Sequence, residues 1–142
     1  LFEPLFEALP VQWVSLQRGR LDPAEPALLE KFDILHVAPQ GADEIEELAA
    51  LLGALDHVVS IDTAVVHLAG ALGRPVSVVL PLCPEWRYGT RGSRMLWYPS
   101  ARLYRQAVLG SWTEPLQAVQ TELENRFGGS NATLDRENMS SA

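Results

Sequence analysis

The sequence has a single cysteine, no long hydrophobic run and no dinucleotide-binding glycine motif. Cys83 alone excludes an intrachain disulfide or a cysteine-rich metal site, and it fits a reducing compartment such as the cytoplasm. Apolar runs are only a few residues long, so we expect no transmembrane segment, and no basic region leads into an apolar stretch as in a secretion signal. No Gly-x-Gly-x-x-Gly follows any expected strand, which argues against a nicotinamide-dependent dehydrogenase.

Positive charge is also scarce, and what there is lies mostly in one segment. The 142 residues carry a net charge of −7. Residues 57–112, however, hold six arginines, no lysine and two acidic residues, whereas the segments on either side are acidic. A narrow arginine-rich segment suits forked contacts to a small anion such as phosphate, while a nucleic-acid partner needs a wider basic surface. A solvated arginine surface without a ligand is the alternative.

Residues 58–80 read as strand, helix and strand, and we expect the chain to be organised around them. Three β-branched residues predict a buried strand: Val58, Val59 and Ile61. Apolar residues then recur at helical spacing: Val65, Leu68, Ala69 and Leu72. Gly73 and Pro75 end that helix before the apolar run of residues 76–80. Two strands joined by so short a helix form a βαβ unit, which predicts a parallel sheet.

The turn into this helix is the candidate binding site. Asp62 and Thr63 are favoured N-cap residues, and a helix that starts at a strand end offers free N–H groups and partial positive charge to an anion. We expect these amides and the Thr63 hydroxyl to bind phosphate, with Ala64 leaving room for it. His67 lies one turn later on the same helix face, within reach of that ligand. Alternatively, Asp62 only caps the helix and His67 is a half-buried structural histidine.

The other elements alternate in the same way. Helices are expected at residues 1–9, 43–55 and 113–127, strands at 11–16, 34–37 and 103–106, and a loop or short helix at 21–32. The apolar faces expected to point inward are Leu1, Phe2, Leu5, Phe6 and Leu9; Ile45, Leu48, Leu52 and Leu55; and Leu116, Val119, Leu123 and Phe127. Residues 1–127 therefore form one domain, and residues 128–142 are expected to be a disordered tail. The acidic start of helix 43–55 indicates electrostatic capping rather than a metal site.

Two loops add polar candidates beside the turn. Gln17 and Arg18 leave the carboxyl end of an expected strand, where open α/β sheets bind ligands. The loop of residues 81–100 is rich in aromatic residues, and Trp86, Tyr88, Trp97 and Tyr98 suit stacking on a base or sugar. Arg87 suits a phosphate contact. Alternatively, Trp86 and Trp97 pin the loop to the core; His36 is interpreted as structural.

Three separated motifs resemble glycosyltransferase family 9, the heptosyltransferase-like enzymes. They are residues 62–76, with the sequence DTAVVHLAGALGRPV; residues 84–88, PEWRY; and WYPS at 97–100 followed by RLYRQ at 102–106. Residues 15–17 and 54–56 also fit. The resemblance is strongest to the branch fused to tetratricopeptide-repeat proteins of bacteria, although Leu48 stands where the family often has a threonine.

The resemblance implies a Rossmann-like parallel sheet with helices on both faces, the C-terminal half of a GT-B glycosyltransferase. That half binds a nucleotide diphosphate sugar as donor for inverting transfer, with no further cofactor and no metal. It implies that this chain lacks the opening strand of the domain, the acceptor-binding N-terminal half and any repeat helices. The N-terminal half and the repeat helices would be the partners of this chain. The chain alone is then expected at most to bind the donor, and no catalytic residue is assigned in it. The donor-site residues expected are Gln17, Arg18, Asp62, Thr63, Ala64, Val65, His67, Trp86 and Arg87. A non-catalytic nucleotide-binding or interaction module is the alternative.

Overall fold

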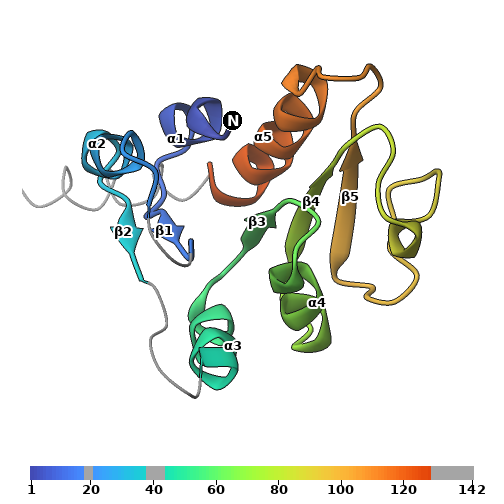
Figure 1. The fold of residues 1–142 in the computed structure, drawn as a ribbon, viewed down its shortest axis with the longest axis horizontal. Coiled ribbons are helices and arrows are strands. Elements are labelled where there is room, and N and C mark those ends of the chain that lie inside the picture. The colour runs from blue at the N-terminus through green and yellow to red at the C-terminus, as the bar shows by residue number, and fades with distance from the viewer. Residues whose placement is uncertain (18–20, 38–43, 129–142) are drawn as a thin grey trace, which may run out of the picture.

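The structure is a computed structural model that describes residues 1–17, 21–37 and 44–128. Helices and strands alternate along the chain (Figure 1). The elements are α1 Glu3–Ala8, β1 Val14–Ser15, α2 Glu25–Lys31, β2 Leu35–His36, α3 Glu44–Ala54, β3 Val58–Ser60, α4 Ala64–Ala71, β4 Val76–Leu80, the 3-10 helix η1 Trp86–Tyr88, β5 Ala101–Arg105 and α5 Thr113–Phe127. The predicted tail lies outside the described residues, apart from Gly128.

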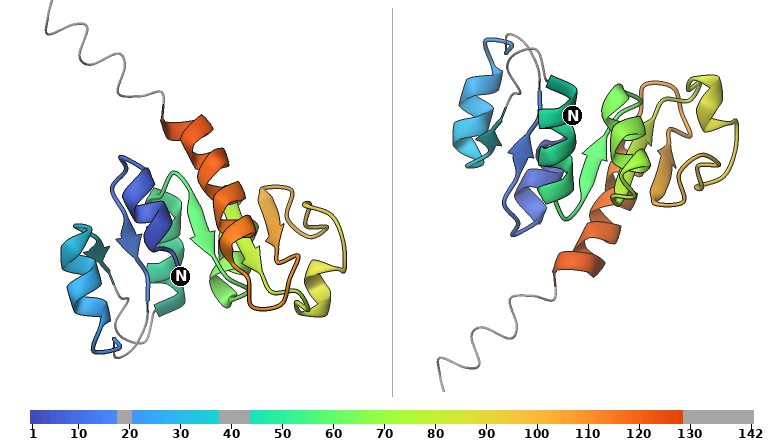
Figure 2. Two further views of the ribbon diagram at one scale, coloured as in Figure 1. Left: turned by 90° about the horizontal axis from the view of Figure 1, so that it is seen from above. Right: turned by 90° about the horizontal axis from the view of Figure 1, so that it is seen from below.

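The strands form two parallel sheets. In one, β1 pairs with β2; in the other, the order is β3-β4-β5. Helices α1, α2 and α5 lie on one side of the strands and α3 and α4 on the other (Figures 1 and 2). The α/β class with helices on both faces is therefore confirmed, but within the described residues no pairing joins the two sheets into one.

The predicted βαβ unit is present. Val58 of β3 is in register with Val76 of β4, and Gly73 ends α4 with φ +66, a backbone conformation that glycine adopts without strain. The inward face of α4 agrees with the expected one in part: Ala69 is buried, and Val65 and Leu68 are partly buried against the core. Val66 and Gly70 are buried as well, whereas Leu72 is 45% exposed. The ring of Tyr98 packs so closely on Gly70 that no Cβ fits there, so this side of the helix faces the loop of residues 81–100.

The core lies in two apolar layers that share β4. On one side α3 and α4 cover the sheet, with Leu52, Val66 and Val78 fully buried. On the other side α1 and α5 cover it, with Leu5, Val79 and Val119 buried. Because β4 is covered on both faces and paired on both edges, all five of its residues are buried.

Several end positions differ from the sequence-based expectation. Leu1 is 55% exposed because it precedes α1, and Ile45 is 69% exposed in the first turn of α3. The first two strands are only two residues long, and the last begins two residues earlier than expected. The bounds of α5 agree with the prediction, and Leu116, Val119 and Leu123 point inward as expected. No described helix is long and apolar enough to cross a bilayer.

Candidate functional site

The turn between β3 and α4 leaves two backbone amides free. Thr63 is the N-cap residue, with extended backbone, and its N–H donates to the carbonyl of Ile61 at 2.8 Å. The N–H of Val66 donates to the carbonyl of Thr63 at 3.1 Å. The N–H groups of Ala64 and Val65 are then the ones at this helix start without an intrahelical acceptor. They are available to an anion, favoured by the helix dipole.

No side chain caps α4, so the interpretation of Asp62 as its cap is wrong. Asp62 precedes the N-cap residue, and Thr63 occupies that place instead. Residues 62 and 63 are both exposed. Burial, and then the negative charge of the Asp62 carboxylate, raise the pKa of the Tyr88 hydroxyl to about 12. Tyr88 is consequently protonated at neutral pH.

A short chain of hydroxyl groups holds the turn. The Ser60 hydroxyl donates to the carbonyl of Ile61 at 2.9 Å, and it lies 3.1 Å from the Thr63 hydroxyl. Since Ser60 has only one proton, Thr63 must be the donor in the second bond. The oxygen of Thr63 therefore presents lone pairs outward, and its proton reaches a phosphate only if the Thr63–Ser60 bond is given up.

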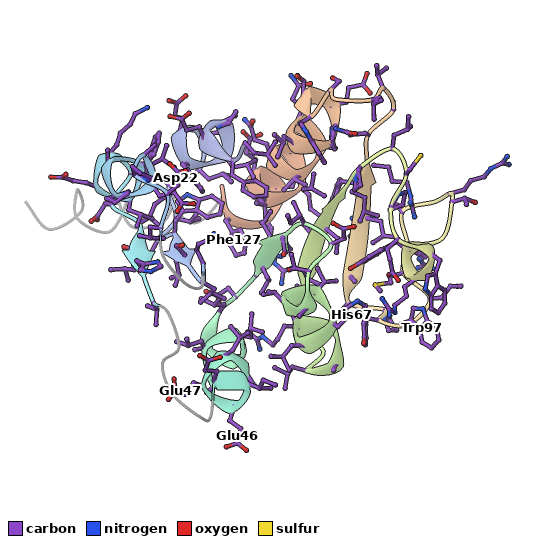
Figure 3. All side chains as sticks on the ribbon, viewed as in Figure 1. Asp22, Glu46, Glu47, His67, Trp97 and Phe127 are labelled. Atoms are coloured by element: carbon purple, nitrogen blue, oxygen red, sulfur yellow. The ribbon has the colours of Figure 1, made fainter. Side chains whose placement is uncertain are left out.

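A groove of about 990 Å³ brings together part of the predicted site. Gln17 from the end of β1 lines it, as do Thr63, Ala64 and Val65 from the start of α4. Its other walls are formed by β1, β3 and the helices that cover them, and Figure 3 shows Phe127 in the space between the two sheets. Asp62, His67, Trp86 and Arg87 do not line this groove. Arg18 lies outside the described residues.

His67 is held by two tyrosines instead of facing the groove. Its ring lies 6.0 Å from that of Tyr88 and 5.8 Å from that of Tyr98, centroid to centroid, and it is half-buried. This environment agrees with the alternative interpretation, in which His67 is a half-buried structural histidine. The same side of the molecule carries Trp97 (Figure 3). Because β3 and β4 are parallel, the turn after β3 and the start of the loop after β4 leave the same edge of the sheet, its carboxyl edge.

Arg87 and Trp86 are on that edge but are not buried in it. Trp86 is 71% exposed and Trp97 is 60% exposed, so neither pins the loop. The Arg87 guanidinium pairs with Glu85 at 2.7 Å and lies 5.3 Å from the centre of the Trp86 ring. The loop is pinned by Tyr88 and by Met95, which are both 4% exposed.

Most arginines of the positive segment have structural partners. Arg105 donates to the carbonyls of Tyr88, Gly89 and Gly92, Arg74 to that of Leu55, and Arg102 pairs with Glu122. The sequence analysis did not identify Ser60, which bonds to the Thr63 hydroxyl, or Arg105, which holds the loop. The available signal for Ser60 was a serine three residues before an N-cap threonine. No sequence pattern indicated the role of Arg105. Among the described residues no group of three or more His, Cys, Asp or Glu is placed to hold a metal ion.

Comparison with known proteins finds a family match in the part of the chain that contains the turn between β3 and α4. Residues 26–79 match the sequence model of glycosyltransferase family 9 (heptosyltransferase), and this range includes the whole turn between β3 and α4. The chain is also 30% identical over 128 residues, or 88% of its length, to Protein FlbA of Caulobacter vibrioides. It spans about a fifth (21%) of that relative's length. No solved structure matches the chain.

Proposed function

We propose that this chain is the donor-binding domain of a glycosyltransferase that takes its sugar from a nucleotide diphosphate sugar. The observation that carries the proposal is the turn between β3 and α4. The amides of Ala64 and Val65 have no intrahelical acceptor, both residues line a groove, and the turn lies inside the range matched by the glycosyltransferase family 9 model. A diphosphate is the part of such a donor that these groups suit.

The turn sets the binding geometry by its hydrogen bonds. The Ala64 and Val65 amides donate to one phosphate, and the Thr63 hydroxyl adds a third bond after rotating away from Ser60. Gln17 on the opposite wall of the groove offers an amide to the sugar or the base. The Arg87 guanidinium can contact the diphosphate only after its ion pair with Glu85 breaks. Arg87 therefore adds to the affinity for the donor but does not orient it.

Inverting transfer also needs an acceptor hydroxyl and a base held in line with the donor carbon, with water excluded. We assign these parts to a second domain that closes over the carboxyl edge of the sheet. The described residues supply one wall of such a cleft. On this proposal the 142-residue chain binds the donor but does not transfer its sugar.

Binding of nucleoside diphosphates with each common base, measured by calorimetry on the chain, tests the proposal. We expect weak, base-dependent binding, and Thr63→Val should weaken it by about 1–2 kcal/mol, about 5–30-fold. Thr121→Val is the matched control, because Thr121 is an exposed threonine on α5 whose hydroxyl bonds to the carbonyl of Gln117. Its affinity should equal that of the unmodified chain.

Two outcomes would contradict the proposal. A folded chain that binds none of these diphosphates, alone or within a longer polypeptide, would favour a non-catalytic interaction module. Sugar transfer by the purified chain itself would overturn the assignment of the base to a second domain.

A further inference from the structure

A second cavity lies at the edge of the larger sheet opposite to the turn between β3 and α4. It has a volume of about 250 Å³, and its lining includes Val76 and Ala101, the first residues of β4 and β5. Helix α5 follows β5 and runs back over the sheet, so its last turns reach the same edge (Figure 2). The turn leaves the other edge, roughly 13 Å away along strands that rise about 3.3 Å per residue. The cavity and the turn are therefore separate sites.

Three arginines line this cavity from three parts of the chain. Arg94 lies in the loop of residues 81–100, Arg102 on β5 and Arg126 in the last turn of α5. Glu122 is the acidic residue of the lining, and it pairs with Arg102 at 3.2 Å. Among the described residues neither Arg94 nor Arg126 has a carboxylate partner. The lining therefore carries an excess of positive charge, in a chain whose net charge is −7.

The backbone places two of these arginines opposite each other. Arg94 and Arg102 form an antiparallel bridge, next to the bond from the Leu103 N–H to the carbonyl of Ser93 at 2.9 Å. Opposite residues of such a pair direct their side chains to the same face, with Cβ atoms about 5 Å apart, and like charges there are destabilising. An anion between the two guanidinium groups would remove this repulsion.

Two polar residues of the lining are incompletely satisfied. His57 lies 2.9 Å from the Ser77 hydroxyl through Nε2, but its Nδ1 is buried and has no hydrogen-bond partner. The hydroxyl oxygen of Ser100 is likewise buried and without a partner. Burial, and then the charge of Arg126, lower the pKa of His57 to about 4, so His57 is neutral at pH 7 and adds no charge to the cavity. Buried polar atoms without partners are uncommon, and a bound ion is one of their ordinary explanations.

The size and charge of the cavity specify the ligand. Its volume is below the roughly 300–1,000 Å³ of pockets that hold drug-sized molecules, so it suits a compact group. A guanidinium group binds two oxygen atoms of a phosphate through parallel bonds, and three such groups match a dianion better than a single carboxylate. All three arginines are exposed, so a ligand can enter from solvent.

We propose that this cavity, between the amino ends of β4 and β5 and the carboxyl end of α5, binds the phosphate dianion of inorganic phosphate or of a small phosphomonoester. Arg94 and Arg126 donate to its oxygen atoms, and Arg102 shares its five N–H donors between the phosphate and Glu122. This inference does not depend on the proposed function, because the donor turn lies at the opposite edge of the sheet.

NMR titration of the 142-residue chain with inorganic phosphate, at neutral pH and constant ionic strength, tests the proposal. The amide signals of Arg94 and Ala101 should shift and saturate, while those of Ala64 and Val65 should stay in place. Bound phosphate should also raise the pKa of His57, because a nearby anion favours the charged imidazole. Shifts confined to Ala64 and Val65 would overturn the proposal and assign phosphate to the donor turn.

Arg126→Gln should weaken phosphate binding about 3–10-fold, since it removes a charge-assisted contact made by an exposed side chain. Arg91→Gln is the matched control, because Arg91 is an exposed arginine of the loop of residues 81–100 that does not line the cavity. Its affinity should equal that of the unmodified chain. An unchanged amide signal of Val78, in the core, checks that each variant folds. Equal losses in the two variants would overturn the proposal and assign the binding to net charge.

Glycerol phosphate in place of inorganic phosphate distinguishes the two sources. Tighter binding of glycerol phosphate would assign the cavity to a phosphomonoester, and tighter binding of inorganic phosphate would assign it to the free ion. Acetate at the same ionic strength should cause no saturable shift, and shifts equal to those with phosphate would overturn the preference for a dianion. The absence of any saturable shift with phosphate would also overturn the proposal, and would leave Arg126 only the stabilisation of the carboxyl end of α5.

Discussion

The two sheets of this molecule differ in how well they are buried. In the β3-β4-β5 sheet the central strand is buried at all five positions. In the β1-β2 sheet both residues of β2 are exposed, and Leu35 has 52% of its surface in water. Both regions contain apolar strand residues, so composition does not explain the contrast. The difference lies in neighbours: β4 has a strand on each edge and a helix layer on each face, while β2 is an edge strand.

This contrast indicates that stability is concentrated in the larger sheet. Substitutions should therefore have large effects in the first region and small effects in the second. The following predictions test that difference, beginning with the largest effect.

Leu80→Ala should destabilise the fold by about 2–5 kcal/mol, because Leu80 is completely buried at the end of β4 and its removal leaves a cavity. Leu35→Ala, the matched change in the smaller sheet, should alter the free energy of unfolding by less than about 0.5 kcal/mol. Urea unfolding followed by circular dichroism measures both. Similar losses for the two variants would remove the contrast between the sheets.

Gly70→Ala should cost about 1–3 kcal/mol, since an added Cβ would overlap Cγ of the Tyr98 ring and force the ring to move. Gly53→Ala in α3 is the control, because nothing lies within 4 Å of the added atom and alanine favours a helix by about 1 kcal/mol. Thermal unfolding should shift the two variants in opposite directions. A stabilised Gly70 variant would mean that Tyr98 does not fix α4.

His57, at the amino end of β3, should make stability depend on pH. Burial, and then the positive charge of Arg126, lower the pKa of His57 to about 4 from the usual value of 6.5. Below pH 6.5 His57 binds a proton in the unfolded chain but not in the folded chain. The contribution of His57 to the free energy of unfolding is therefore fully present above that pH and is lost as the pH falls towards 4. Because His57 is partly exposed, we expect a loss of only about 1–2 kcal/mol.

His57→Gln should remove this part of the pH dependence, while His36→Gln, at an exposed histidine, should leave it in place. Urea unfolding at several pH values between 7 and 4, compared among the three chains, isolates the effect from that of the carboxylates. An unchanged slope in the His57 variant would contradict the assignment.

Glu85→Gln should have the smallest effect, below about 1 kcal/mol, because its ion pair with Arg87 is exposed to solvent. The change releases Arg87, so it should also strengthen the binding of a nucleoside diphosphate by a few-fold if Arg87 reaches the ligand. Glu114→Gln, at an acidic residue in the first turn of α5, is a control for net charge. Equal changes in affinity would assign the effect to charge alone.

Local sequence patterns were sufficient for the elements but not for their contacts. The change from strand to helix periodicity and the pair Gly73 and Pro75 predicted β3, α4 and β4, and the spacing of apolar residues predicted the bounds of α5. These signals act over a few residues. The burial of Gly70 in α4 could not be predicted, because it depends on Tyr98, which is distant in sequence and reaches Gly70 only through the fold.

The candidate site was predicted in part for the same reason. A strand followed by Asp62 and Thr63 was enough to locate the turn, but both residues are favoured N-caps, and the interpretation that chose Asp62 as the cap was wrong. Nor could the pattern show that His67 turns towards two tyrosines from the loop of residues 81–100. Side chains that meet across elements depend on packing that no local spacing encodes.

Arg105 has a consequence for movement at the carboxyl edge. Its guanidinium donates to three loop carbonyls, those of Tyr88, Gly89 and Gly92, from a strand in the sheet. Burial lowers its pKa but leaves the group charged at neutral pH. Moving the loop away from the sheet would break three charge-assisted hydrogen bonds at once. We therefore expect this loop to stay in place, so that any segment that closes over the turn must belong to another part of the polypeptide.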